Sequence, residues 1–249
     1  MPPYTLLAIL AHPDDEVLCA GTLMAQKAMG SRVVVLWLTK GEMTNAFGDL
    51  SSGEIAKRRQ DLGFEALDII GIEGRFLDLP DSAVEVSVQA SQKVANIVAD
   101  IKPDGILTWG DAWVRGFRHP DHQATGEIAR NAVNFARITK VVNPENPHRE
   151  FCPIFTMRDI HSILPAVAVD VSDHVDKIFQ VADHYRKAIG FGDVKWLKAR
   201  LQSSGSDWGS DYAEVFDAWE TGGGLTETLL PHLAADFDHH PPRSSDSKY

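Results

Sequence analysis

The chain has 249 residues, of which 44% are hydrophobic and 24% are charged. This length allows one large domain, or at most two small ones, with a substantial core. Acidic residues outnumber basic ones by 35 to 24, which gives a formal net charge of -11. A chain this acidic is poorly suited to bind nucleic acid or anionic lipid without a concentrated basic patch. The longest basic run is Lys57–Arg59, so we expect neither a nucleic-acid partner nor a membrane partner.

The amino-terminal segment and the cysteine content indicate a cytoplasmic protein. The first residues, MPPYTLLAILAHPDDE, have no cationic start, no cleavage site of small residues and only a short apolar run. No segment reaches the 18 apolar residues that a membrane-spanning helix needs. Two cysteines do not make a disulfide framework, and Cys19 lies in an apolar helical stretch, where we expect a buried free thiol.

The first forty residues predict a parallel strand–helix–strand unit. Residues 4–11 form a short apolar run that is typical of a buried strand. Apolar residues then recur at helical spacing over 16–29, and Gly30 ends that helix. Residues 32–39 (RVVVLWLT) are rich in β-branched residues and predict a second strand. Two strands joined by a crossover helix lie parallel in one sheet.

The same alternation continues through most of the chain. We expect further helices at 53–70, 84–101, 121–135 and 173–188, and further strands at 74–79, 105–109 and 167–171. Repeated alternation predicts an α/β fold, a Rossmann-like doubly wound and mostly parallel sheet with helices on both faces. Such folds bind ligands outside the carboxyl ends of the strands.

The last third of the chain is less regular in pattern. Residues 203–224 are rich in glycine and serine, which favours a surface loop. We therefore expect a single domain over residues 1–237, with 190–237 as an irregular or cap segment. The tail at 238–249 is polar and has two prolines, which predicts disorder.

Two groups of polar residues follow predicted strands. His12, Asp14, Asp15 and Glu16 crowd one turn between the first strand and the first helix. A helix cap needs only one of these acids. His119-Pro120-Asp121-His122 follows the strand at 105–109 and opens a helix, with Pro120 in the first turn, where proline fits.

The two groups together predict a catalytic metal centre. Histidine nitrogens and carboxylate oxygens are zinc ligands, and two histidines with one carboxylate leave an open coordination position. Water bound in that position has a pKa of about 7. A remaining carboxylate can then act as general base, and a remaining histidine as general acid or oxyanion donor.

These residues resemble the PIG-L/LmbE-like family of zinc-dependent N-acetylglucosamine deacetylases. Ala11–Glu16 (AHPDDE) corresponds to the first motif of the family and His119–His122 (HPDH) to the second. The similarity runs from about residue 5 to residue 190. It implies an LmbE-like fold and a hydrolase that removes an N-acetyl group from an amino sugar or its glycoside by zinc-activated water.

The resemblance also implies roles for individual residues. His12, Asp15 and His122 correspond to the metal ligands of the family. Asp14 corresponds to the general base, and His119 to the general acid or transition-state stabiliser.

The substrate-binding residues are less well defined by the resemblance. The family has a substrate-binding arginine early in the second helix, to which Arg59 corresponds, with Arg58 as the alternative. Asp81 corresponds to an aspartate near the site, or is a turn residue. His184 lies where the family has a His-Arg-Ser-Gln-like stretch that this chain lacks, so we expect His184 to be structural.

Other functions compete with deacetylation. A zinc amidase that cleaves a larger amide, such as a thiol–sugar conjugate, would use the same residues. A non-catalytic sugar- or nucleotide-binding protein is a second alternative, although no G-x-G-x-x-G follows the first strand. A purely structural protein is a third. Fe²⁺ could replace Zn²⁺ on such a ligand set, and a homo-oligomer is compatible with the sequence.

Overall fold

The structure is a computed structural model, and it describes residues 3–110, 119–142, 146–159, 161–191 and 193–234. Across these residues the chain forms an eight-stranded sheet with the strand order β3-β2-β1-β4-β5-β7-β6-β8. The strands are β1 (Thr5–Leu10), β2 (Arg32–Trp37), β3 (Glu73–Phe76), β4 (Gly105–Thr108), β5 (Ile154–Met157), β6 (Ala166–Asp170), β7 (Ala213–Ala218) and β8 (Gly224–Thr226).

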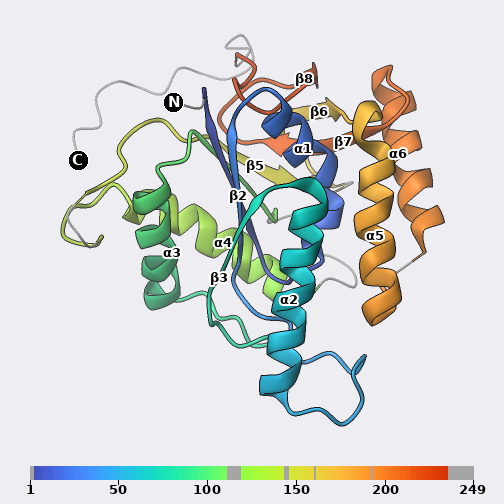
Figure 1. Cartoon of the computed structure of the whole chain (residues 1–249). Coiled ribbons are helices and arrows are strands. Elements are labelled where there is room, and N and C mark those ends of the chain that lie inside the picture. Colours follow the sequence, from blue (N-terminus) through green and yellow to red (C-terminus); the bar gives the residue numbers. More distant parts are fainter. Residues whose placement is uncertain (1–2, 111–118, 143–145, 160, 192, 235–249) are drawn as a thin grey trace.

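Helices cover both faces of this sheet (Figure 1). The α-helices are α1 (Ala20–Ala28), α2 (Ser52–Ile70), α3 (Val88–Ile101), α4 (Pro120–Phe135), α5 (Val175–Ile189) and α6 (Val194–Trp208). Two short 3₁₀ helices, η1 (Asp15–Leu18) and η3 (Ser172–His174), precede α1 and α5. The predicted α/β architecture is therefore confirmed.

The sheet is parallel except at β7. Strand β1 pairs in parallel with β2 and β4, and the flanking strands β3 and β5 continue that direction. Strand β7 is antiparallel to both β5 and β6. The carboxyl ends of β1, β2, β4 and β5 consequently share one edge of the sheet, where the two polar motifs were expected to meet.

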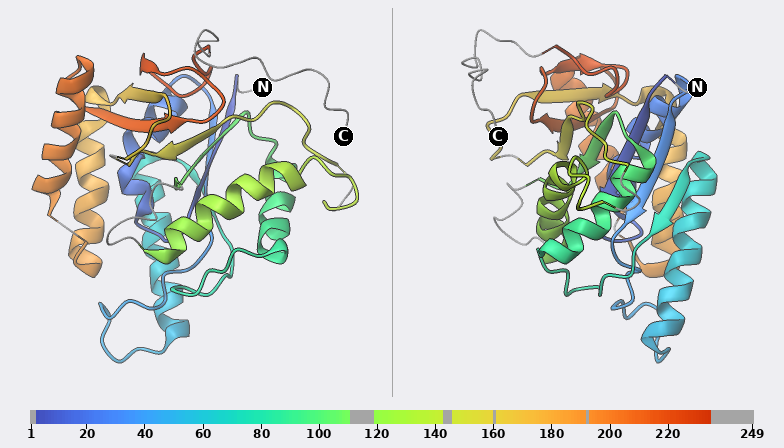
Figure 2. Two further views of the ribbon diagram at one scale, coloured as in Figure 1. Left: turned by 180° about the vertical axis from the view of Figure 1, so that it is seen from behind. Right: turned by 90° about the vertical axis from the view of Figure 1, so that its left-hand side faces the viewer.

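The alternation of side chains along β1 divides the core into two layers. Leu6, Ala8 and Leu10 pack in the layer beneath α1, α2, α5 and α6. Leu7 and Ile9 point to the opposite layer, beneath α3 and α4. Figures 1 and 2 show these two groups of helices on opposite faces of the sheet. Because β1 is buried on both faces, its sequence is continuously apolar.

Two predicted helices differ in their start. The helix expected over 16–29 divides into η1 and α1, with Cys19 between them. The helix expected from residue 84 begins only at Val88, because Ser87 caps it by accepting the backbone N–H of Ala90. The N–H of Val84 instead donates to the carboxylate of Asp121, so the segment before α3 reaches the site.

The prediction that 190–237 is irregular was wrong for residues 194–208 and 213–218. Residues 194–208 form α6, which buries Leu197 and Leu201, and 213–218 form β7 inside the sheet. Gly205 belongs to the buried face of α6, where a Cβ would lie 2.7 Å from backbone atoms of Asp211. The glycine therefore allows close packing and does not mark a loop. Strand β5 was also missed, and the tail at 238–249 lies outside the described residues.

Further sequence expectations concern cysteines and membranes. Cys19 and Cys152 are both buried free thiols, which confirms the expectation for Cys19. No helix among the described residues is long and apolar enough to cross a membrane.

Gly126 holds α4 close to the end of β4. A Cβ at Gly126 would lie 2.2 Å from the backbone oxygen of Trp109. We expect Gly126→Ala to lower the free energy of unfolding by about 1–3 kcal/mol, because the helix must move to admit the methyl group. Gly53 in α2 has no atom within 4 Å of its Cβ position, so Gly53→Ala is the matched control. Urea denaturation of both variants measures the difference, and equal stability would contradict the close approach.

Candidate active site

The turn after β1 is built around the carboxylate of Asp15. Its Oδ2 accepts the backbone N–H groups of Ala11 at 2.9 Å and His12 at 3.0 Å, and Nε1–H of Trp109 at 3.1 Å. Its Oδ1 faces Nε2 of His122 at 3.2 Å. One carboxylate thus joins the ends of β1 and β4 to the start of α4. Burial raises the pKa of Asp15, but the neighbouring histidines outweigh this and hold the pKa well below its usual range.

The HPDH motif opens α4 on the other side of the site. His119 is the N-cap, and its Nδ1 accepts the backbone N–H of Asp121 at 3.3 Å. His122 lies one turn further and stacks on Trp109, with ring centroids 3.7 Å apart and an interplanar angle of 6°. The indole therefore fixes the plane of the His122 ring while its Nε1–H holds Asp15.

Three of these side chains can hold one metal ion. Ligand atoms of His12, Asp15 and His122 lie within 4.8 Å of one another. Bonds from zinc to nitrogen and oxygen ligands are about 2.0–2.2 Å, so two ligands of one ion lie up to about 4.4 Å apart. Shifts of a few tenths of an ångström are therefore enough for a single ion to reach all three. The donor set, two imidazoles and one carboxylate, suits zinc or ferrous iron. The residues of this chain therefore fit a catalytic divalent metal.

The far nitrogen of His12 is held by two further carboxylates. Nε2 of His12 lies 3.1 Å from Oδ2 of Asp121 and 3.2 Å from Oδ1 of Asp81. These contacts fix the orientation of the imidazole and leave Nδ1 facing Asp15. Burial lowers the pKa of His12, but the hydrogen bonds with Asp121, Asp15 and Asp81 outweigh it and raise that pKa to about 12. Carboxylates that orient a metal-binding histidine in this way strengthen metal binding.

Asp121 itself is firmly held. Its side chain is 1% exposed, and its two oxygens accept the backbone N–H groups of Ser82 at 2.7 Å and Val84 at 3.2 Å. It therefore ties the segment before α3 to the start of α4. Sequence reasoning assigned Asp121 no role, although its place inside the HPDH motif was the available signal.

Asp14 lies beside the proposed ligands and pairs with an arginine. Its Oδ2 lies 3.1 Å from Nη2 of Arg59, whose side chain is only 4% exposed. Burial raises the pKa of Asp14 to about 6, against the opposing effect of the Arg59 charge. The Nε and Nη1 atoms of Arg59 are buried and have no hydrogen-bond partner among the described residues.

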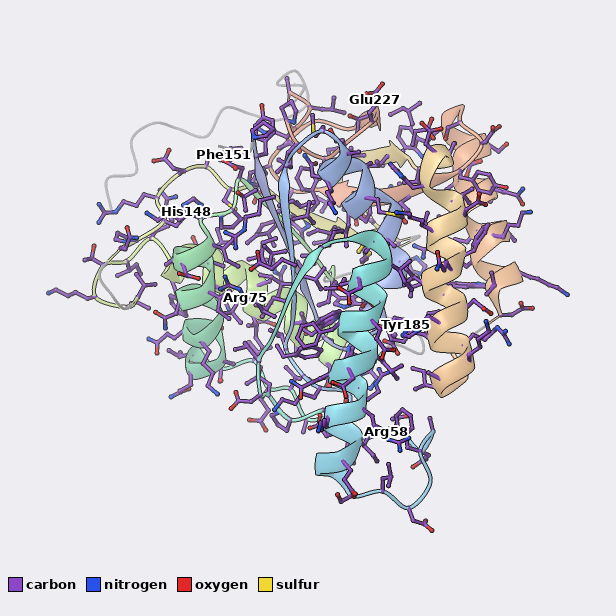
Figure 3. The ribbon with its side chains drawn as sticks, in the orientation of Figure 1. Arg58, Arg75, His148, Phe151, Tyr185 and Glu227 are labelled. Atoms are coloured by element: carbon purple, nitrogen blue, oxygen red, sulfur yellow. The ribbon has the colours of Figure 1, made fainter. Side chains whose placement is uncertain are left out.

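The structure distinguishes Arg59 from Arg58. Arg59 lines the cavity of the site. The guanidinium of Arg58 lies 5.5 Å from the ring centre of Phe47, in the loop before α2. Figure 3 shows Arg58 beside this loop, near the start of α2. His184 contacts the backbone oxygen of Leu62 at 3.2 Å and does not line the cavity, in agreement with a structural role.

A cavity of about 380 Å³ brings all seven predicted site residues together. They are His12, Asp14, Asp15, Arg59, Asp81, His119 and His122. Sequence reasoning did not find the rest of the lining: Leu18, Gly41, Met43, Thr44, Ser82, Trp109, Ile189 and Phe191. Ile189 and Phe191 come from the end of α5 and the residues after it, which places part of the carboxyl-terminal third in the wall of the site.

Comparison with known proteins identifies the family. The sequence profile of the family described as GlcNAc-PI de-N-acetylase (PIG-L) matches residues 7–133, which contain both motifs. The chain belongs to this family. A diacetylchitobiose deacetylase from Thermococcus kodakarensis is 28% identical over 191 residues, covering 72% of this chain and 68% of that protein.

Solved structures share the fold of this PIG-L family member. The N,N'-diacetylchitobiose deacetylase from Pyrococcus horikoshii superposes with a TM-score of 0.76 at 24% identity, covering 94% of this chain and 88% of that one. The 4-carboxy-2-hydroxymuconate hydratase GalB from Pseudomonas putida KT2440 gives 0.70 at 16% identity, covering 86% and 95%. Similarity at these sequence identities establishes only that the fold is shared. Because GalB is a hydratase, the fold does not by itself determine the reaction.

Removal of single ligands tests the metal centre. We expect His12→Ala, Asp15→Ala and His122→Ala each to lose bound zinc, because each removes one of three donors. His119→Ala is the control, and we expect it to keep stoichiometric metal. Metal analysis of the purified variants measures this. Equal metal loss in His119→Ala and His122→Ala would contradict the assignment.

A milder change tests the carboxylate behind His12. Asp121→Asn keeps the shape of the side chain but removes the negative charge beside Nε2 of His12. We expect zinc affinity to fall by about 10–100-fold, measured by competition with a chelator. An unchanged affinity would show that Asp121 only joins the two segments.

Proposed function

We propose that this protein is a zinc-dependent N-deacetylase that removes the acetyl group from an N-acetylated amino sugar or its conjugate. The observation that carries the proposal is the separation of roles in one cavity. Two groups of side chains are close enough to share an ion: His12, Asp15 and His122, and His12, Asp81, His119 and Asp121. We assign the ion to the first group, because Nε2 of His12 already contacts Asp121 and Asp81 and leaves Nδ1 facing Asp15. Asp14 and His119 then line the same cavity outside the assigned ligand set. Membership of the de-N-acetylase family supports the reaction class.

The residues of the chain would share the work of amide hydrolysis. When bound, zinc would polarise the acyl carbonyl and lower the pKa of a water molecule. The carboxylate of Asp14 accepts a proton as the water oxygen adds to the carbonyl carbon. Asp14 then returns this proton to the nitrogen as the carbon–nitrogen bond breaks, so that acetate and a free amine result. Arg59 keeps Asp14 oriented through its ion pair.

His119 is suited to stabilise negative charge on the carbonyl oxygen. Its Nδ1 accepts the N–H of Asp121, so the neutral ring carries its proton on Nε2. Burial lowers the pKa of His119 below its usual value. A neutral ring at pH 7 donates a hydrogen bond without itself losing a proton.

The amino-sugar class of substrate is supported by the relatives, one of which is named for diacetylchitobiose. The zinc amidase acting on a larger amide keeps the same residues and differs only in the acyl group. Cytoplasmic location, the homo-oligomer and the choice of zinc over iron stay predictions from the sequence.

The first test is acetate release. Zinc-loaded and iron-loaded protein is incubated with N-acetylglucosamine, its disaccharide and its glycosides, and acetate and free amine are measured together. Equal amounts of the two products establish deacetylation and rank the substrates. Amine formed from thiol–sugar conjugates without acetate would favour the larger-amide hydrolase. With metal bound and no product from any of them, the proposal would fail.

Asp14 supplies the sharpest single variant. We expect Asp14→Asn to lower kcat by about 10²–10⁴-fold, because the amide cannot accept the proton. Zinc content should stay stoichiometric, since Asp14 is outside the ligand set. Steady-state kinetics with metal analysis measures both, and near wild-type turnover would overturn the assignment of Asp14 as general base.

A further inference from the structure

Glu16 is a buried carboxyl group that the proposed mechanism does not use. It is 0% exposed and accepts three hydrogen bonds from three parts of the fold. Its Oε2 accepts the backbone N–H of Asp14 at 3.0 Å and Nε1–H of Trp37 from β2 at 3.0 Å. Its Oε1 accepts the hydroxyl of Tyr185 from α5 at 2.5 Å. A fully buried acid is stable only with hydrogen-bond partners. One of the three partners of Glu16 is the backbone N–H of Asp14, the proposed general base.

The backbone of Asp14 needs support. Its φ is 146° and its ψ is -16°, in a region of backbone conformation that residues other than glycine rarely adopt. Such a conformation is strained and persists only where neighbouring contacts hold it. The hydrogen bond from Asp14 N–H to Glu16 is one such contact. It sets the direction in which the Asp14 side chain leaves the turn.

Tyr185 connects the backbone of Asp14 with its side-chain partner. Its hydroxyl donates to Glu16, and its ring centre lies 6.0 Å from the guanidinium carbon of Arg59. Arg59 in turn contacts the Asp14 carboxylate. Tyr185 is fully buried on α5, which packs against α2, the helix of Arg59 (Figure 3). Helix α5 therefore supports Asp14 from two sides, through Glu16 at the main chain and through Arg59 at the carboxylate.

We propose that Glu16, held by Tyr185 and Trp37, is a positioning residue that keeps the Asp14 peptide in its strained conformation and so keeps the Asp14 carboxylate in reach of the reacting water. The assignment rests on the proposed function of Asp14. Its structural part, the control of the Asp14 backbone, can be tested separately from turnover.

Three variants and one matched control test this proposal kinetically. In Glu16→Leu the N–H of Asp14 loses its acceptor, and we expect kcat to fall by about 10–100-fold with KM and zinc content unchanged, because small misplacements of a reacting group cost this much. In Glu16→Gln the amide oxygen still accepts from Asp14 and Trp37 while the amide NH₂ can donate to Tyr185, so we expect kcat to recover to within about threefold of wild type. Tyr185→Phe removes only the hydroxyl, and we expect a smaller loss in kcat.

The control is a second buried glutamate, which accepts its hydrogen bonds from two backbone N–H groups away from the site. Glu214 accepts those of Gly21 and Thr22 at the start of α1, at 3.0 and 2.8 Å, and is 3% exposed. We expect Glu214→Leu to lower stability as Glu16→Leu does, with kcat unchanged. If both variants lose kcat equally, the effect is general destabilisation and the proposal is overturned. An unchanged kcat in folded Glu16→Leu, or in Tyr185→Phe where Glu16→Leu does not fold, overturns it as well.

Crystal structures of the zinc-loaded wild type and Glu16→Leu, or Tyr185→Phe in its place, supply the readout that does not depend on activity. We expect the Asp14 peptide to leave its positive φ and the contact between Asp14 and Arg59 to open. An Asp14 that keeps both overturns the positioning role whatever the kinetics show. If wild type releases no acetate but Asp14 moves in the variant, the proposed function fails, while the control of the Asp14 backbone by Glu16 stands.

Discussion

The site depends on the hydrogen bonds that the buried carboxylate of Asp15 accepts. It accepts two backbone N–H groups from the turn after β1 and the indole N–H of Trp109 after β4, and its other oxygen faces His122 on α4. A buried carboxylate is stable only with such partners. Because all of these partners come from neighbouring segments at one edge of the sheet, a single side chain sets the distance between the two motifs. A metal ion bound to Asp15 would inherit that geometry.

The side chains around Asp15 form two groups with different partners. Asp121 and Asp81 contact the far side of His12 and orient its imidazole. Asp14 and Arg59 form a second pair on the opposite side of the turn, and Glu16 lies beneath Asp14 in the core layer of α5. The neighbouring acids of this motif therefore have different partners. Asp15 faces His122, Asp14 contacts Arg59, and Glu16 accepts hydrogen bonds from Trp37 and Tyr185 in the interior.

Most strands and helices of the fold were predicted from the pattern of apolar residues, and the wrong predictions have physical causes. Strands β1 and β2 are continuously apolar after their first residues, Thr5 and Arg32, because both faces of a parallel sheet are covered. Strand β7 has the short sequence AEVFDA with two acids, and its neighbour α6 carries serines and glycine where Gly205 touches the next loop. Local composition indicated a loop in both cases, whereas packing against the sheet made a strand and a helix. Tertiary contacts overrode local preference there.

The sequence by itself determined the type of site: two polar motifs at the ends of parallel strands, with histidines and carboxylates in numbers that suit a three-ligand metal centre. It also placed Asp14, Arg59 and Asp81 among the candidates. Only the tertiary structure decided that Arg59 and not Arg58 lines the cavity and that Asp121 contacts His12. It also decided that Ile189 and Phe191 from the last third of the chain line the cavity, and that Tyr185 contacts Glu16. The reason is that a motif specifies donor atoms locally, while the partners that orient them are distant in the chain and meet only when the helices pack on the sheet.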